Sequence, residues 1–146
     1  MTAYYDEIII KVPSGSAYLE LIRSFISLLM KKAGFSESKV DQIELAVDEA
    51  CSNVVKYAYD IEKDKDRKIE IRVEVDRKKA TITVRDHGKG FDPDTIYHPN
   101  MEEYLAKYKS GGLGIYIMQS LMDEISYDVN PGRNTAVKMV KYLENT

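Results

Sequence analysis

The fold of this chain is decided by residues 36–59, SESKVDQIELAVDEACSNVVKYAY. Apolar residues recur there every three or four positions, which predicts a helix with one buried stripe. The stripe consists of Ile43, Val47, Ala50, Val54 and Ala58, widened by Ala46, Cys51, Val55 and Tyr57. Glu49 and Asn53 fall nearly opposite it, one turn apart, so their side chains share a ledge that can hold an ion or a water. The same arrangement also suits a solvated polar face.

The composition is that of a soluble globular protein, with 146 residues, 44% of them hydrophobic and 31% charged, and a net charge of −3. We expect one domain over residues 1–146, with no basic stripe for nucleic acid and no apolar run that spans a membrane. The N-terminus lacks the pattern of a signal peptide. The single cysteine, Cys51, lies on the apolar stripe, which predicts a buried thiol in a reducing, cytoplasmic compartment.

Local patterns predict two elements before the central helix. Residues 7–12 (EIIIKV) are rich in β-branched residues and favour a strand. An amphipathic helix follows and ends at Gly34, a residue type that closes helices in a left-handed conformation. Ser36 then suits the N-cap of the central helix, because Phe35 and Val40 flank it at the spacing of a hydrophobic staple.

A β-hairpin is predicted after the central helix. Residues 69–75 and 80–86 alternate strictly between apolar and polar and are joined by a short polar turn, as in an antiparallel sheet covered on one side. The pattern dissolves over residues 92–110, which indicates a lid or binding loop. A helix over 115–125 and two further strands, 125–129 and 135–143, complete an α/β (α+β) two-layer sandwich. In it, three main helices cover one face of an antiparallel-rich mixed sheet.

Two glycine clusters stand where a strand ends and where a helix begins. In DHGKG, residues 86–90, the missing side chains of Gly88 and Gly90 allow a ligand to approach the backbone. In GGLG, residues 111–114, free backbone N–H groups at a helix N-terminus form an anion site. The chain has neither a GxxxxGK[ST] phosphate loop nor a GxGxxG after its first strand, so any nucleotide site here is of another kind.

Taken in order, ExxxN on a helix, DxGxG after a strand and GxG at a helix start resemble the gyrase/Hsp90/histidine-kinase type of ATP-binding domain, the Bergerat-type fold. The resemblance is closest to bacterial anti-sigma-factor serine/threonine-protein kinases of stress-response partner switches. The stretches that carry it are KVPSG at 11–15, LIRS at 21–24, AVDEACSNVVKYAY at 46–59, GGLGIYIMQSLMDEI at 111–125 and VKYL at 140–143.

The resemblance implies a role for each residue that matches a motif of the family. Glu49 is expected to be the general base that takes the proton from a protein serine, and Asn53 to be a ligand of Mg²⁺. Asp86 is expected to accept from the adenine amino group of ATP. The remaining expected nucleotide contacts are Gly88, Gly90 and Thr135 near the base, and Gly111, Gly112, Leu113 and Gly114 near the phosphates.

The same resemblance implies two partners, a sigma factor and an anti-anti-sigma protein. Phosphorylation of the anti-anti-sigma protein on a serine is expected to release it from the kinase. The resemblance also implies a homodimer. Two alternatives remain open from the sequence. One is a nucleotide-gated binding module without phosphoryl transfer. The other is a stand-alone histidine-kinase catalytic domain, although neither His87 nor His98 sits on a long amphipathic helix. His87 stands where the family has an acidic or small residue, and we expect it to be an exposed loop histidine.

Overall fold

The computed structural model describes residues 5–59, 66–88, 114–130 and 133–144. Some of the sequence-based predictions lie outside these residues. They concern Gly90, Gly111, Gly112, Leu113, His98, the side chain of Tyr57 and the lid at 92–110.

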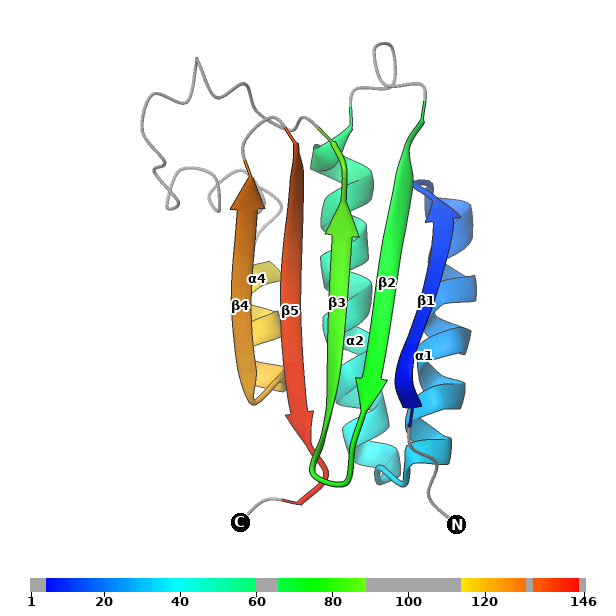
Figure 1. The fold of residues 1–146 in the computed structure, drawn as a ribbon, viewed down its shortest axis with the longest axis vertical. Helices are drawn as coiled ribbons and strands as arrows, with labels where there is room; N and C mark the ends of the chain where they lie inside the picture. The colour runs from blue at the N-terminus through cyan, green and yellow to red at the C-terminus, as the bar shows by residue number, and fades with distance from the viewer. Residues whose placement is uncertain (1–4, 60–65, 89–113, 131–132, 145–146) are drawn as a thin grey trace.

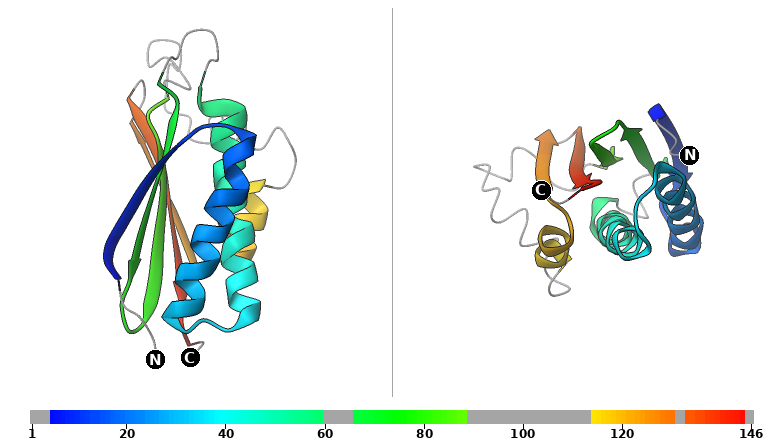
Figure 2. Two further views of the ribbon diagram at one scale, coloured as in Figure 1. Left: turned by 90° about the vertical axis from the view of Figure 1, so that its right-hand side faces the viewer. Right: turned by 90° about the horizontal axis from the view of Figure 1, so that it is seen from below.

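The described residues form one sheet with helices on one of its faces (Figure 1; Figure 2). The strands are β1 (Tyr5–Pro13), β2 (Lys68–Val75), β3 (Lys79–Asp86), β4 (Glu124–Asn130) and β5 (Asn134–Tyr142). The helices are η1 (Ser16–Tyr18), α1 (Leu19–Ala33), α2 (Glu37–Asn53), η2 (Val54–Ala58) and α4 (Gly114–Leu121). The two-layer sandwich predicted from the sequence is therefore confirmed.

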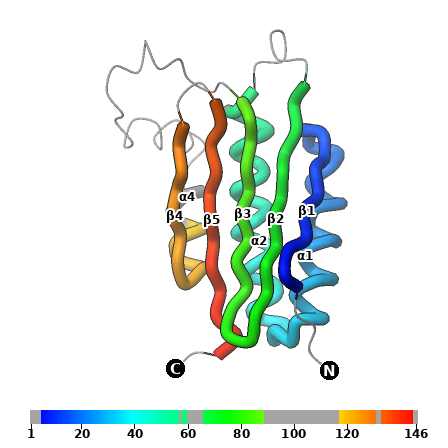
Figure 3. Tube along the Cα trace, in the orientation of Figure 1, coloured from blue at the N-terminus to red at the C-terminus, as the bar shows by residue number. Residues whose placement is uncertain are grey.

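The five strands lie in the order β1-β2-β3-β5-β4, which can be followed along the chain trace in Figure 3. Each pairing between these strands is antiparallel, so the part of the sheet that the structure describes is antiparallel throughout and is not the mixed sheet that the sequence led us to expect. Strand β3 lies at the centre because it pairs with its hairpin partner β2 on one side and with the distant β5 on the other. The end of β3 is thus the point where early and late segments of the chain meet.

The core lies between the sheet and the helices, as the alternation of the strands predicts. Every second residue of β2 and β3 points into it, and α1 and α2 contribute their apolar stripes. The largest fully buried side chains include Ile22, Ile26 and Met30 of α1, Ile43 and Val47 of α2, Ile69 and Ile71 of β2, and Ile82 of β3. Cys51 is buried among them, as predicted.

The helix boundaries near the central helix follow the local signals. Gly34 ends α1 with φ of 98°, a left-handed conformation that glycine adopts without strain. The hydroxyl of Ser36 accepts a hydrogen bond of 3.3 Å from the Lys39 N–H and so caps α2. An ion pair of 2.9 Å between Arg23 and Asp48 joins α1 to α2. None of the described helices is long and apolar enough to cross a membrane.

Two helices depart from the prediction. The central helix was expected to run unbroken to Tyr59, but after Asn53 it widens into the π-helix η2. The helix expected over 115–125 ends at Leu121. It stops there because the residues that follow pair with the sheet, beginning with the Asp123 N–H, which donates to the Val140 carbonyl of β5 at 2.9 Å. The buried ammonium of Lys141 donates to the Leu121 carbonyl at 2.6 Å and closes α4.

Candidate functional site

A pocket lies between the helix layer and the sheet, at the end where β3 stops. Its walls come from α2, η2, α4, β3, β4 and β5, so the pocket exists only when these elements are assembled. The lining residues are Ala50, Asn53, Val54, Val84, Asp86, Met118, Tyr127, Thr135 and Val137. A mostly apolar lining with a few polar groups is the usual character of a small-molecule site.

Three of the residues predicted from the sequence meet in this pocket, namely Asn53, Asp86 and Thr135. Asp86 is the last residue of β3, and the register places it directly opposite Thr135 of β5. Asn53 reaches the pocket from the last position of α2. All three are buried although they are polar, with exposed fractions of 6%, 3% and 9% for Asn53, Asp86 and Thr135. Buried polar side chains gathered at a pocket are candidates for ligand recognition.

The carboxyl group of Asp86 has an unusual acidity. Burial raises its pKa to about 7, although a 3.0 Å hydrogen bond from the Gly88 N–H and the charge of Arg85 both lower it. Desolvation wins because the side chain is 3% exposed and a charge there loses most of its hydration. Near neutral pH this group is therefore divided between its protonated and ionised forms.

Glu49 and Asn53 occupy different environments, although both belong to α2. Asn53 is buried in the pocket, so it does not belong to a solvated polar face, the alternative that the sequence left open. Glu49 lies one turn earlier on α2, is partly buried and is not among the lining residues. The two side chains that were expected to lie together therefore differ, because that of Asn53 lines the pocket and that of Glu49 does not.

Gly88 makes its close approach to the protein itself. A Cβ atom at this position would lie 1.9 Å from the Ala58 carbonyl oxygen at the end of η2, which no side chain tolerates. The missing side chain therefore makes room for this carbonyl. The approach of a ligand to the same backbone, which the sequence led us to expect, stays a prediction. Gly114, the other described glycine of the predicted set, begins α4. Met118, one turn later, lines the pocket.

Two predictions about reactive side chains are confirmed. Burial raises the pKa of the Cys51 thiol far above its usual range, so this cysteine is a protonated core residue. His87 is exposed and lies just past the end of β3.

Sequence reasoning did not assign six of the nine lining residues to the site, and it also missed Tyr59, which lies behind the pocket. Met118 and Tyr127 line the pocket, and both could have been found from the periodicity of α4 and β4, which turns them inward. Tyr59 follows η2, and its hydroxyl accepts a hydrogen bond of 3.0 Å from the His87 N–H. Nothing in the local sequence pattern indicates that contact, because its two partners come from distant segments.

Comparison with known proteins agrees with this geometry. Residues 12–141 match the histidine kinase-like ATPase domain, which is nearly the whole chain. The chain belongs to this family. Among curated members, it is 33% identical over 144 residues to the serine-protein kinase RsbW of Bacillus subtilis, covering 94% of this chain and 86% of that protein. It is 32% identical over 148 residues to RsbW of Staphylococcus aureus, covering 99% and 91%.

A solved structure shows the same fold for this member of the histidine kinase-like ATPases. The crystal structure of the RsbU and RsbW domains of Rv1364c from Mycobacterium tuberculosis superposes with a TM-score of 0.68 over 95% of this chain and 32% of that one. The sequence identity is 15%, so this likeness supports the fold alone. The RsbW-type serine-protein kinases thus match this chain in sequence, and an RsbW-containing protein matches it in fold.

Proposed function

We propose that this protein is an ATP-dependent protein serine kinase of the RsbW type, and that it also acts as an anti-sigma factor. The observation that carries the proposal is the convergence of Asn53, Asp86 and Thr135 on one largely apolar pocket, from a helix and two strands that are far apart in the sequence. These are the residues that the family motifs assign to nucleotide binding. The curated relatives are named serine-protein kinases, which favours phosphoryl transfer over the two alternatives raised by the sequence.

In this proposal the pocket holds the adenine base. Val84, Met118 and Val137 supply apolar contacts for its faces, while the carboxylate of Asp86 accepts from its amino group. The ionised form of Asp86 is the better acceptor, because charged hydrogen bonds are about twice as strong as neutral ones. Thr135, opposite Asp86, is the second polar group beside the base. Gly88, through its N–H, fixes the carboxylate that recognises the amino group.

The residues present also fit a magnesium ion bound together with ATP. Mg²⁺ prefers oxygen ligands and is commonly held by one or two side chains plus substrate phosphates. The buried carboxamide of Asn53 offers one such oxygen inside the pocket. The described parts of the chain hold no cluster of three or more His, Cys, Asp or Glu side chains that could bind a metal alone, so Asn53 would share the ion with the phosphates. When bound, Mg²⁺ neutralises negative charge on those phosphates.

Glu49 is the proposed general base. It lies one turn from Asn53 on α2, is partly buried and is outside the pocket lining, so it is not one of the side chains that would contact the base of the bound nucleotide. The carboxylate accepts the proton of a serine hydroxyl as the serine oxygen bonds to the γ-phosphorus of ATP. The bond from that phosphorus to the β–γ bridging oxygen breaks, and ADP leaves. Gly114 and the glycines before it would contact the phosphates.

The proposed partners follow from the family. The substrate is an anti-anti-sigma protein, whose phosphorylation releases it so that the kinase can hold a sigma factor, in a partner switch of the stress-response kind. A homodimer is the proposed working form, as the family resemblance implies. The cytoplasm is its proposed location, because a single buried cysteine fits a reducing compartment.

The test is transfer of γ-labelled phosphate from ATP to an anti-anti-sigma protein of the same organism, with and without Mg²⁺. We expect an acid-stable phosphoserine on the substrate. A label that stays on the kinase and is lost in acid would instead indicate a histidine kinase. Binding of ATP with no transfer to any candidate would indicate a nucleotide-gated binding module.

A further inference from the structure

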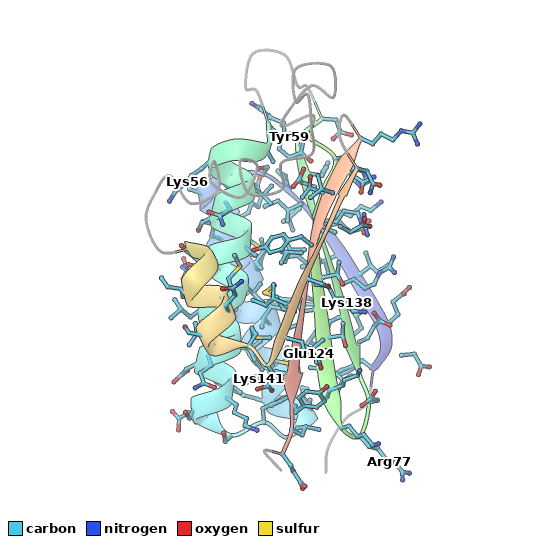
Figure 4. The ribbon with its side chains drawn as sticks, turned by 90° about the vertical axis from the view of Figure 1, so that its left-hand side faces the viewer. Lys56, Tyr59, Arg77, Glu124, Lys138 and Lys141 are labelled. Atoms are coloured by element: carbon cyan, nitrogen blue, oxygen red, sulfur yellow. The ribbon has the colours of Figure 1, made fainter. Side chains whose placement is uncertain are left out.

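One tyrosine, Tyr59, links the C-terminal end of η2 to the end of β3 by a hydrogen bond. The hydroxyl of Tyr59, the first residue after η2, donates to the Lys68 carbonyl at 2.5 Å and accepts from the His87 N–H at 3.0 Å. Lys68 begins β2 and His87 follows β3. Figure 4 shows Tyr59 at the upper end of the molecule, beside the ends of the helix and the strands.

The two backbone groups that bond to Tyr59, the Lys68 carbonyl and the His87 N–H, lie at the end of the β2–β3 ladder. The last pair in the ladder of β2 and β3 is Ile69 with Asp86, so Lys68 and His87 would form the next pair in register. In place of a direct bond between them, the tyrosine hydroxyl stands in the ladder and bonds to both. The ladder therefore continues one step past Asp86, but through a side chain that belongs to the helix layer.

A second contact fixes the same short segment. The backbone at Gly88 packs so closely on the Ala58 carbonyl that a Cβ atom there would lie 1.9 Å from the oxygen. The Gly88 N–H in turn donates to Oδ1 of Asp86 at 3.0 Å. The two residues that follow Asp86 are therefore both fixed by the end of the helix layer. His87 bonds to Tyr59, and Gly88 packs on the Ala58 carbonyl. These contacts lie at the C-terminal end of the π-helix η2, which follows Asn53.

We propose that Tyr59 is a positioning residue for nucleobase recognition, which holds the end of β3 so that the Asp86 carboxylate faces an amino group on the bound purine. This inference rests on the proposed function, because it concerns the adenine end of that site. Tyr59 is not among the pocket-lining residues, so it acts through Asp86 and not by contact with the base. Beyond Asp86 no further backbone pair of β2 and β3 forms, and the tyrosine hydroxyl supplies the hydrogen bonds of the next step in its place.

The test compares two ligands that differ only at the group Asp86 would recognise, ATP and purine riboside 5′-triphosphate, which lacks the 6-amino group. Binding of each is measured by calorimetry at pH 8, where Asp86 is ionised because its pKa lies near 7. Wild type should prefer ATP by roughly tenfold or more, the factor expected for a hydrogen bond to a charged group. Tyr59→Phe keeps the ring and removes the hydroxyl, and it should reduce this preference at least about threefold, by the same reasoning.

A matched control is Tyr142→Phe. The Tyr142 hydroxyl bonds to Glu124, which lies toward the opposite end of the molecule in Figure 4, so its loss should leave the preference for ATP unchanged. Inorganic tripolyphosphate serves as a probe of the phosphate end alone. Its affinity should be the same in wild type and Tyr59→Phe, because the change acts at the base.

The outcomes separate the possibilities. A reduced preference for ATP together with unchanged tripolyphosphate binding supports the positioning role. A Tyr59→Phe protein with the wild-type preference overturns it, even if its thermal stability falls, since the hydroxyl would then be only structural. Equal losses for ATP, purine riboside triphosphate and tripolyphosphate overturn it as well. A wild-type protein that binds none of the three would overturn the proposed function itself, and this inference with it.

Discussion

Replacing Asp86 with asparagine should stabilise the protein and abolish nucleotide recognition at the same time. The variant has nearly the same shape, and its amide oxygen can still accept from the Gly88 N–H, as the carboxylate does at 3.0 Å. What it removes is a charge buried at 3% exposure. If the amide oxygen of the variant accepts from the Gly88 N–H, its NH₂ group points toward the pocket. There it would face the amino group of adenine, and two donors cannot form a hydrogen bond with each other.

The size of the stability effect follows from the pKa of Asp86, which burial raises from 3.8 to about 7. The folded state then binds the proton more tightly than the unfolded state does. Wild type therefore loses stability as the pH rises from about 4 to about 7, and the loss is complete above the folded pKa. The difference between these two pKa values corresponds to at most about 4 kcal/mol of unfolding free energy. Asparagine does not titrate, so Asp86→Asn escapes this loss.

The assay is urea unfolding of wild type and Asp86→Asn at several pH values between 4 and 8. The quantity to follow is the difference in unfolding free energy between the two proteins, because every other titrating group is common to both and largely cancels. We expect this difference to grow in favour of the variant as the pH rises and to level off above pH 7. A difference that is the same at pH 4 and pH 8 would refute the reasoning, since Asp86 would then titrate alike in the folded and unfolded states.

Three further substitutions test the rest of the site. Asn53→Ala should lose the Mg²⁺-dependent part of ATP affinity in calorimetry, and equal affinities for the two proteins in Mg²⁺ would remove Asn53 from the metal site. Glu49→Gln should lower serine phosphorylation by about 10²–10⁴ with little change in ATP affinity; Glu44→Gln on the same helix is the control, and a wild-type rate for Glu49→Gln would exclude the base. Gly88→Ala should cost about 1–3 kcal/mol or more in urea unfolding, since its Cβ meets the Ala58 carbonyl. Gly15→Ala, whose Cβ meets only the Tyr18 ring at 3.6 Å, should be nearly neutral, and equal losses in both would contradict the contact.

The elements of the fold were predictable because their signals are local. The stripe of residues 36–59, the alternation of the β2–β3 hairpin and the glycine at position 34 each depend on neighbours within a few positions, and the structure follows them. The boundaries that failed are those decided by tertiary contacts. Helix α4 stops at Leu121 because β5 pairs with the residues that follow. Helix α2 gives way to the π-helix η2 after Asn53, and the far end of η2, at Ala58, packs on Gly88.

The candidate site was predictable only in part, for a related reason. Family motifs indicated Asn53, Asp86 and Thr135, and the structure brings these three together. The contribution of Tyr59 depends on a hydroxyl that reaches Lys68 and His87, which lie 9 and 28 positions away in the sequence. The environment of Asp86 likewise depends on burial by several elements at once, so its pKa could not be anticipated from the DHGKG sequence.

The antiparallel pairing of β3 with β5 also has a consequence for how the protein folds. The hairpin of β2 and β3 needs only a short turn, whereas Asp86 and Thr135 meet across a long excursion of the chain. Closing such a loop is slower and entropically costlier than closing a hairpin, so we expect the β3–β5 seam to form late. The pocket spans that seam. A refolding molecule would then acquire affinity for its ligand only in the last step, and ligand binding would report the completion of folding.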